Sequence, residues 1–161
     1  NLNKNNIKTH FIGIPLIIWS IALLLTTIDF DIEAAGMIVN VKLTLVIVAI
    51  ILLYYFILSI PLALSAILLF SPLIYSSIIM VDTEYKLLLV IVAFVIGWIL
   101  QLLGHSYEKA KPAFIDDLNQ LAIGPLFLVA EIYFALGFGH KLANNVKTLA
   151  IEKRKNFESE R

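Results

Sequence analysis

Long hydrophobic runs alternate with short polar stretches along this sequence. Residues 11–27 form the first apolar run, which is about the minimum length for crossing a hydrocarbon core of roughly 30 Å. Residues 43–81 are too many for one crossing at about 1.5 Å per residue, so we predict a turn at Ser59, Ile60 and Pro61. Further runs cover residues 87–103 and 121–139. The pattern predicts an all-α fold, a multispanning membrane helical bundle with four to five transmembrane or re-entrant helices.

The charges that flank these runs predict the orientation of the chain. Lys4 and Lys8 precede the first run. An acidic cluster follows it, made of Asp29, Asp31 and Glu33. The positive-inside rule therefore places the N-terminus, and with it His10, at the cytoplasmic face. Because the crossings alternate, His105 returns to the same face.

A fifth crossing by residues 121–139 conflicts with the positive-inside rule, because it would export a tail that is rich in Lys and Arg. Either one of the five segments is re-entrant or interfacial, or the tail charges are overruled. In the tail, Leu142, Val146 and Leu149 fall on one helical face amid Lys and Asn. This spacing predicts an amphipathic helix on the membrane surface over about residues 141–161.

Composition favours one integral membrane domain over residues 1–161, with no separate soluble module. Of the 161 residues, 60% are hydrophobic and 15% are charged, which is outside the usual balance of a soluble domain. Twelve basic residues balance twelve acidic ones, so we expect no nucleic-acid partner. The chain has no cysteine, which excludes disulfides, thiolate metal sites and a cysteine nucleophile.

Residues 97–131 carry many polar groups for so apolar a chain. One helix face holds a stripe of polar and small residues, namely Gly97, Gln101, Gly104, His105 and Glu108. Lys111 precedes Pro112, so we expect the helix to stop there and a second helix to start with Pro112 in its first turn. One line on that second helix holds Gln120, Gly124 and Glu131.

His10, His105 and Glu108 would bring two imidazoles and one carboxylate together at one membrane face. This is a ligand set typical of non-heme Fe(II) sites. Spacing alone leaves this open, because His and Glu three residues apart occur on many helices that bind no metal. Glu131 is a further candidate ligand, since a charged group in a membrane costs roughly 2.5 to 3.5 kcal/mol, although it could instead pair with a lysine.

Several of these polar residues could have roles outside an iron site, and other classes of enzyme fit the sequence less well. Gln101 and Gln120 could equally form hydrogen bonds between helices, and Lys109 and Lys111 could simply extend to lipid headgroups. Three histidines are too few for the diiron sites of membrane desaturases. A Gly-rich phosphate loop, a GxSxG motif and an HExxH motif are all absent from the sequence.

The segments GWILQLLGH, EKAKPAFIDDLNQ and GPLFLVAE, with Asn6, His10 and GIP at residues 13–15, resemble the membrane family of the fungal 2-hydroxy fatty acid dioxygenase and its bacterial relatives. The resemblance spans nearly the whole chain. It implies an Fe(II)-dependent enzyme of fatty acid α-oxidation, which shortens a long-chain 2-hydroxy fatty acid by one carbon with O2. It also implies a multi-pass protein of a bacterial inner membrane or, in a eukaryote, of the endoplasmic reticulum.

The family's motif residues match Asn6 and His10, Gly104 and His105, Glu108 and Lys109, and Pro112 and Ala113. The resemblance implies that Fe(2+) is held by His10, His105 and a family histidine that precedes Asn1. Glu108 either completes the ligand set or accepts a hydrogen bond that orients His105. Candidate contacts for the substrate are Asn6, Lys109, Lys111 and Gln120, and the alkyl chain would lie among apolar helices open to membrane lipid.

The competing interpretation is a non-catalytic, lipid-binding or scaffolding helical bundle, in which the polar stripe only joins helices. A transporter fits less well, because about five short segments without inverted repeats leave little room for alternating access. Stoichiometric iron in the purified protein would favour the enzyme, and a metal-free protein would favour the bundle.

Overall fold

A computed structural model describes residues 4–34, 36–108 and 119–159. These residues form six helices and one β-hairpin, in the order α1 (Lys4–Thr26), β1 (Asp29–Ala34), β2 (Met37–Lys42), α2 (Leu43–Leu58), α3 (Ile60–Met80), α4 (Lys86–Glu108), α5 (Asn119–Ala135) and α6 (His140–Ser159). The helical bundle predicted from the apolar runs is therefore confirmed. In the described part of the chain, three helices are long and apolar enough to cross a membrane, Asn5–Thr26, Ile60–Met80 and Lys86–Tyr107, and two apolar helices are shorter, Leu43–Leu58 and Ala122–Ala135.

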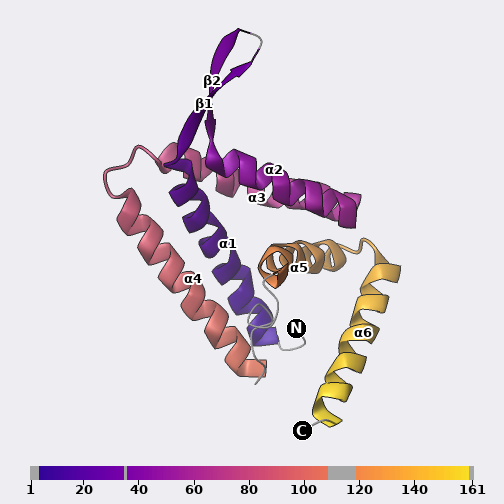
Figure 1. Ribbon diagram of the computed structural model, residues 1–161. Helices are drawn as coiled ribbons and strands as arrows, with labels where there is room; N and C mark the ends of the chain where they lie inside the picture. Colours follow the sequence, from indigo (N-terminus) through magenta and orange to yellow (C-terminus); the bar gives the residue numbers. More distant parts are fainter. Residues whose placement is uncertain (1–3, 35, 109–118, 160–161) are drawn as a thin grey trace.

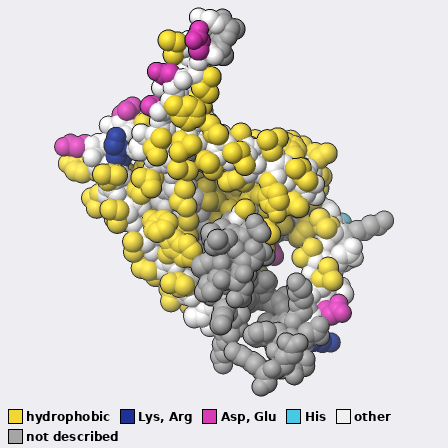
Figure 2. Space-filling view, viewed as in Figure 1, with side chains coloured by type: hydrophobic (Ala, Val, Ile, Leu, Met, Phe, Trp, Pro, Cys, Tyr) yellow, Lys and Arg dark blue, Asp and Glu magenta, His cyan; other side chains and the backbone are white. Residues whose placement is uncertain are grey.

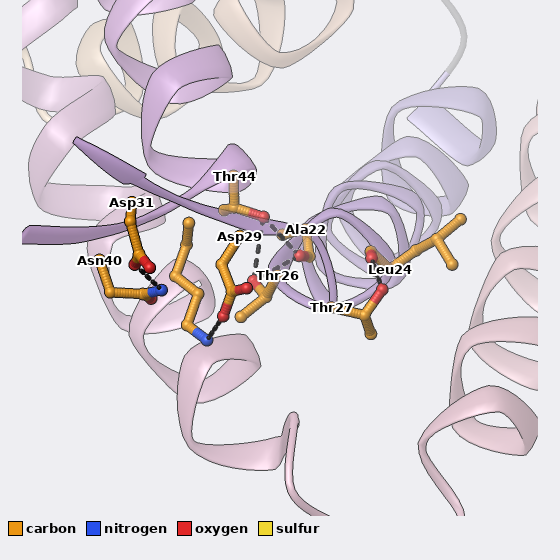
Figure 3. A network of polar contacts seen from close by, with 9 residues as sticks. Ala22, Leu24, Thr26, Thr27, Asp29, Asp31, Asn40 and Thr44 are labelled. Atoms are coloured by element: carbon orange, nitrogen blue, oxygen red, sulfur yellow. Dashed lines mark hydrogen bonds and ion pairs between the residues drawn. The ribbon is translucent and has the colours of Figure 1, made fainter.

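The β-hairpin is the part of the fold that the hydrophobic runs do not predict. Residues 29–33 alternate between polar and apolar side chains, which is the period of a strand. β1 pairs with β2 in antiparallel register, with Asp29 opposite Lys42 and Asp31 opposite Asn40. Side-chain hydrogen bonds of 3.0 Å join both of these pairs (Figure 3). The hairpin projects from the end of α1 and leads the chain into α2 (Figure 1).

The turn predicted within residues 43–81 is confirmed at Ser59, which lies between α2 and α3 with an extended backbone. Its N–H donates to Tyr55 O at 2.8 Å, and its carbonyl accepts from the N–H of Ala63 at 2.9 Å. A single extended residue thus redirects the chain without leaving these backbone groups unpaired. Pro61 fits the first turn of α3, where its missing N–H has no helical partner to lose. As a result, α2 and α3 lie side by side (Figure 1).

Glycines allow α1 to pack closely along α4, and this is the most extensive helix contact in the described residues (Figure 1). A Cβ on Gly13 would lie 2.9 Å from Gly97 O, and a Cβ on Gly97 would lie 2.7 Å from Ile17 Cγ1. Both distances are shorter than real Cβ contacts, so larger residues would push the helices apart. The packing is antiparallel, and it brings the start of α1 to the end of α4.

A second group of helices packs beside this pair. A buried cluster joins α2, α3 and α5, and it consists of Tyr55, Leu62, Ala63, Ala66, Leu126 and Val129. The hydroxyl of Tyr55 also donates a hydrogen bond to Ala122 O, which fixes the first half of α5 against α2. Figure 1 shows α5 beside α2 and α3, with α6 leaving from its far end. Both groups of helices contribute walls to the cavity described below.

The outer surfaces of the helices are hydrophobic. On α4, exposed apolar side chains recur at helical spacing at Leu88, Ile91, Val95, Ile99 and Leu102. Figure 2 shows hydrophobic side chains over most of the visible face, with acidic side chains on the hairpin and at one edge of the molecule. A soluble bundle would present polar residues there, so the surface favours a membrane environment.

The C-terminal part forms a helix over His140–Ser159. It lies where the sequence predicts an amphipathic helix, over about residues 141–161. Its apolar residues Leu142, Val146 and Leu149 are exposed, and their contact with a membrane surface stays a prediction. The helix break expected at Lys111 and the helix start expected at Pro112 lie outside the described residues.

Candidate active site

The two histidines that the charge pattern assigns to one membrane face lie against each other. His10 is near the start of α1 and His105 is near the end of α4, and their ring centroids are 5.0 Å apart with ring planes at 77°. His10 is only 5% exposed and His105 is half-buried. The antiparallel packing of α1 on α4 thus joins two residues that are far apart in the sequence.

The orientation of the His10 ring is set by its own helix. Its Nδ1 lies 2.9 Å from the backbone oxygen of Asn6, one turn earlier. A carbonyl oxygen only accepts hydrogen bonds, so Nδ1 carries the proton and donates it. In a neutral imidazole this leaves Nε2 as the nitrogen with a lone pair. A backbone carbonyl on one ring nitrogen is the common arrangement that prepares the other nitrogen to bind a metal.

Gly104, the residue before His105, lets α4 approach this part of α1. A Cβ built on Gly104 would collide with Asn6 Oδ1 and Thr9 Oγ1, and it would lie 2.9 Å from His10 Cε1. Thr9 is held in place because its hydroxyl donates to Asn6 O at 2.9 Å. Gly104 therefore creates the space in which the imidazoles of His10 and His105 meet, and the next residue, His105, supplies one of these imidazoles.

Two carboxamides beside the histidines are buried, and each has at least one polar atom without a hydrogen-bond partner in the described part of the protein. Asn6 is 0% exposed, and neither its Oδ1 nor its Nδ2 forms a hydrogen bond there. Gln101 is 7% exposed, and its Nε2 has no hydrogen-bond partner there either. Buried polar groups in proteins are nearly always paired, because an unpaired one loses its hydration without compensation. The family resemblance already identifies Asn6, whereas the sequence leaves the role of Gln101 undecided.

A large apolar cavity begins at this cluster. Its volume is about 810 Å³, within the usual range of small-molecule sites. His10, Gln101 and His105 line one end, which we call the head of the cavity, and its other walls are mainly aliphatic and aromatic side chains of α1 to α5. Along α1 the lining extends to Leu25, 15 residues after His10, which is a length of roughly 22 Å at 1.5 Å per residue.

The two imidazoles are arranged so that they could bind one metal ion. Their ring centroids are 5.0 Å apart, and histidine nitrogens bind metal ions at roughly 2.0 to 2.1 Å, so one ion could be held by both rings. The two histidines alone do not complete a ligand set. Glu108 follows His105 by almost one helical turn, at the last residue of α4.

The other candidate residues are only partly placed. Among the residues that the structure describes, no three His, Cys, Asp or Glu side chains gather closely enough to hold a metal. Glu131 is half-buried in α5 and does not form such a group with the two histidines. The side chains of Glu108 and Gln120 lie outside the described part of the chain, as do Lys109 and Lys111 entirely.

Comparison with known proteins adds a family to this geometry. A family described as "2-hydroxy-palmitic acid dioxygenase Mpo1-like" matches residues 2–136, which include α1 to α5 and the whole cavity. The chain is similar to the 2-hydroxy-palmitic acid dioxygenase MPO1 of Saccharomyces cerevisiae, with 32% identity over 162 aligned residues that cover 99% of this chain and 88% of the yeast protein. No solved structure matches the chain significantly.

Proposed function

Because this chain belongs to the Mpo1-like family, we propose that it is an Fe(II)-dependent dioxygenase of fatty acid α-oxidation. Its substrate is a long-chain 2-hydroxy fatty acid, and its product is the fatty acid one carbon shorter, formed with O2. The yeast relative named above is a dioxygenase of 2-hydroxy-palmitic acid, which supports this substrate class.

One observation carries the proposal, namely that the two histidines line the head of a cavity with apolar walls. An acyl chain that fills one leaflet spans about half of a hydrocarbon core of roughly 30 Å, which is about 15 Å. The cavity follows α1 for roughly 22 Å, so it can hold a whole long acyl chain with its polar end at the histidines. A lipid substrate and a reactive centre would thereby be placed together.

The residues of this chain have distinct tasks in the proposed reaction. His10 and His105 hold the iron, and the hydrogen bond from His10 Nδ1 to Asn6 O keeps the ring in position. Glu108 completes the coordination or orients His105. The bound iron supplies the O2 chemistry that no amino-acid side chain performs. The apolar walls exclude water and align the carbon chain so that its polar end alone reaches the site.

Substrate contacts are proposed at the same end. The substrate carboxylate needs hydrogen-bond donors or positive charge when it leaves water. Asn6 contributes a buried amide, and Lys109, Lys111 and Gln120 contribute further groups from the segment that links α4 to α5 and from the start of α5. Entry of substrate from the lipid phase suits a protein with hydrophobic outer surfaces.

We place the site at the cytoplasmic face of a bacterial inner membrane, or of the endoplasmic reticulum in a eukaryote. Lys4 and Lys8 are at the end of α1 that carries His10. In the sequence, Lys109 and Lys111 follow directly after the end of α4 that carries His105. The opposite ends of these helices have only Lys42 and Lys86 next to them, so the excess of lysine on the histidine side supports the orientation through the positive-inside rule.

The test combines metal analysis with turnover. The detergent-purified protein should contain iron in stoichiometric amount, and it should convert a long-chain 2-hydroxy acid to the acid one carbon shorter only when O2 is present. The unhydroxylated acid of the same length is the control and should give no product. A metal-free protein that binds lipid but consumes no O2 would identify a non-catalytic lipid-binding bundle and would refute the proposal.

A further inference from the structure

Gln101 occupies a position in the cavity that neither the metal ligands nor the apolar walls explain. It lies one helical turn before His105 on the same face of α4, and both residues line the head of the cavity together with His10. Its side chain is more than nine-tenths buried. A ligand whose polar end reaches the two histidines would therefore lie close to this carboxamide.

The hydrogen bonding of Gln101 differs from that of two other polar residues that line the cavity, Tyr55 and Thr44. The hydroxyl of Tyr55 donates to Ala122 O, and the hydroxyl of Thr44 donates to Ala22 O. These two groups are satisfied within the fold. The Nε2 of Gln101, by contrast, forms no hydrogen bond in the described part of the protein. A glutamine that only joined helices would donate to a neighbouring helix, and this one does not.

On α1, a glycine lies beside this amide. A Cβ on Gly13 would lie 3.0 Å from Gln101 Nε2, so the absence of a side chain at Gly13 makes room for the carboxamide. Gly13 follows His10 by almost one turn of α1, as Gln101 precedes His105 by one turn of α4. Gln101 thus lies one helical turn from His105, and His10, Gln101 and His105 line the same cavity.

We propose that Gln101 is a substrate-binding residue, whose Nε2 donates a hydrogen bond to a carboxylate oxygen of the fatty acid at the head of the cavity. This inference rests on the proposed function. A carboxylate only accepts hydrogen bonds, and in an apolar cavity it needs fixed donors in place of water. An amide N–H supplies a donor without a charge, so it can remain buried between turnovers at a lower cost than an ammonium group.

Ligand binding in the absence of O2 tests the assignment without turnover. Three ligands of equal chain length are compared: a 2-hydroxy acid, the unhydroxylated acid and the corresponding 1,2-diol. The Gln101→Met variant keeps the length of the side chain but removes its donor. We expect the two acids to bind about 10- to 100-fold more weakly to this variant, as is typical for loss of a hydrogen bond to a charged group, and the diol to bind unchanged.

A second variant and a stability measurement separate this role from a structural one. Gln101→Glu retains the shape but replaces the donor by acceptors, so it should weaken both acids at least as much as Gln101→Met. The melting temperature of ligand-free Gln101→Met should equal or exceed that of the wild type, because the donor that is lost, Nε2, has no partner in the described fold. A lower melting temperature together with equal losses for all three ligands would show that Gln101 only supports packing, and would overturn the proposal.

Ser106→Ala is the matched control, because Ser106 is exposed on α4 and its hydroxyl donates to Leu103 O within the helix. It should leave all three affinities unchanged. Weaker binding of the 2-hydroxy acid and the diol to Gln101→Met, with the unhydroxylated acid unaffected, would assign Gln101 to the hydroxyl and overturn the carboxylate assignment. Wild-type protein that binds neither acid would refute the proposed function itself, whereas unchanged binding of both acids to the variant would refute only the role of Gln101.

Discussion

The two ends of α1 both carry buried polar groups, but the groups are paired at one end and not at the other. At the hairpin end, Thr44 Oγ1 donates to Ala22 O at 2.7 Å, and Thr26 Oγ1 lies 2.7 Å from the same oxygen and 2.9 Å from Thr44 Oγ1 (Figure 3). At the histidine end, both polar side-chain atoms of Asn6 and the Nε2 of Gln101 have no hydrogen-bond partners within the described residues.

This difference distinguishes polar groups that only stabilise the fold from polar groups that are candidates for binding a ligand. A closed network such as the one around Thr26 satisfies its own donors and acceptors, and it needs nothing from outside. Buried amides that stay unpaired are stable only where something else completes them, such as a ligand or an ordered water. In a chain this hydrophobic, the unpaired groups indicate the site more clearly than the mere presence of polar residues does.

The largest effect should come from removing an imidazole at the histidine end. We expect His105→Ala to lose bound iron and to lower product formation by more than about 100-fold, because even changes beside a metal ligand typically cost 10- to 100-fold. Metal analysis and product quantification measure this. His140→Ala is the control, since His140 is exposed at the start of α6. A folded His105→Ala protein that keeps both iron and product would contradict the site.

Closing the space between α1 and α4 should have the next largest effect. In Gly104→Ala the new methyl group would collide with Asn6 and Thr9, which forces the helices apart and separates the imidazoles. We expect a loss of about 1 to 3 kcal/mol of stability, as for overpacking elsewhere, together with impaired iron binding. Thermal unfolding and metal content report the two effects.

Gly124→Ala is the stability control for this variant, because a Cβ there would meet nothing within 4 Å. Alanine is favoured over glycine in a helix by up to about 1 kcal/mol, so this variant should be as stable as the wild type or more so. Equal destabilisation by the two substitutions would show that the close approach at Gly104 is unimportant.

A change at the hairpin end should affect stability alone. Thr26→Val keeps the shape of a fully buried residue but removes its hydrogen bonds to Ala22 and Thr44, which should cost about 1 kcal/mol. Turnover of the folded protein should not change, because Thr26 does not line the cavity. Thr27→Val, at an exposed neighbouring position, should cost less in the same unfolding experiment. An activity loss in folded Thr26→Val would mean that the two ends are coupled.

The smallest effect should be the pH dependence of the hairpin. Lys42 donates a hydrogen bond to the Asp29 carboxylate and thereby holds the pKa of Asp29 below its ordinary value. The pair therefore stabilises the hairpin fully above the unfolded-state pKa of roughly 3.9, and this contribution is lost as the pH falls through the lower folded-state pKa. Asp29→Asn should remove that acid dependence, which can be followed by hydrogen exchange of the hairpin amides between pH 5 and pH 3.

The sequence predicts much of this fold because the lengths of its apolar runs are physically restrictive. The turn at Ser59 follows from a run too long for one crossing, and the meeting of His10 with His105 agrees with alternating crossings. The hairpin is missed because its residues lie outside every long run and because Asp29, Asp31 and Glu33 read as a polar exit. Strand alternation over residues 29–33 is the signal that could have found it.

The candidate site is only partly accessible to such reasoning. The histidines stand out because they are rare in an apolar chain. The cavity does not, since it depends on how the α1–α4 pair and the α2–α3–α5 group fail to fill the space between them. Likewise, the sequence cannot distinguish a glutamine that forms a hydrogen bond between two helices from a glutamine that binds a ligand. Only the three-dimensional arrangement shows that the Nε2 of Gln101 lacks a partner in the described fold.

One of the cavity walls is formed by α1, which lines it from His10 to Leu25 without a break in the helix. The spacing between these residues is set by the rise of the helix and is fixed against α4 by Gly13 and Gly97. Helices respond to a thinner or thicker bilayer by tilting and not by stretching. The range of acyl chain lengths that the protein accepts should therefore be the same in thin and thick membranes.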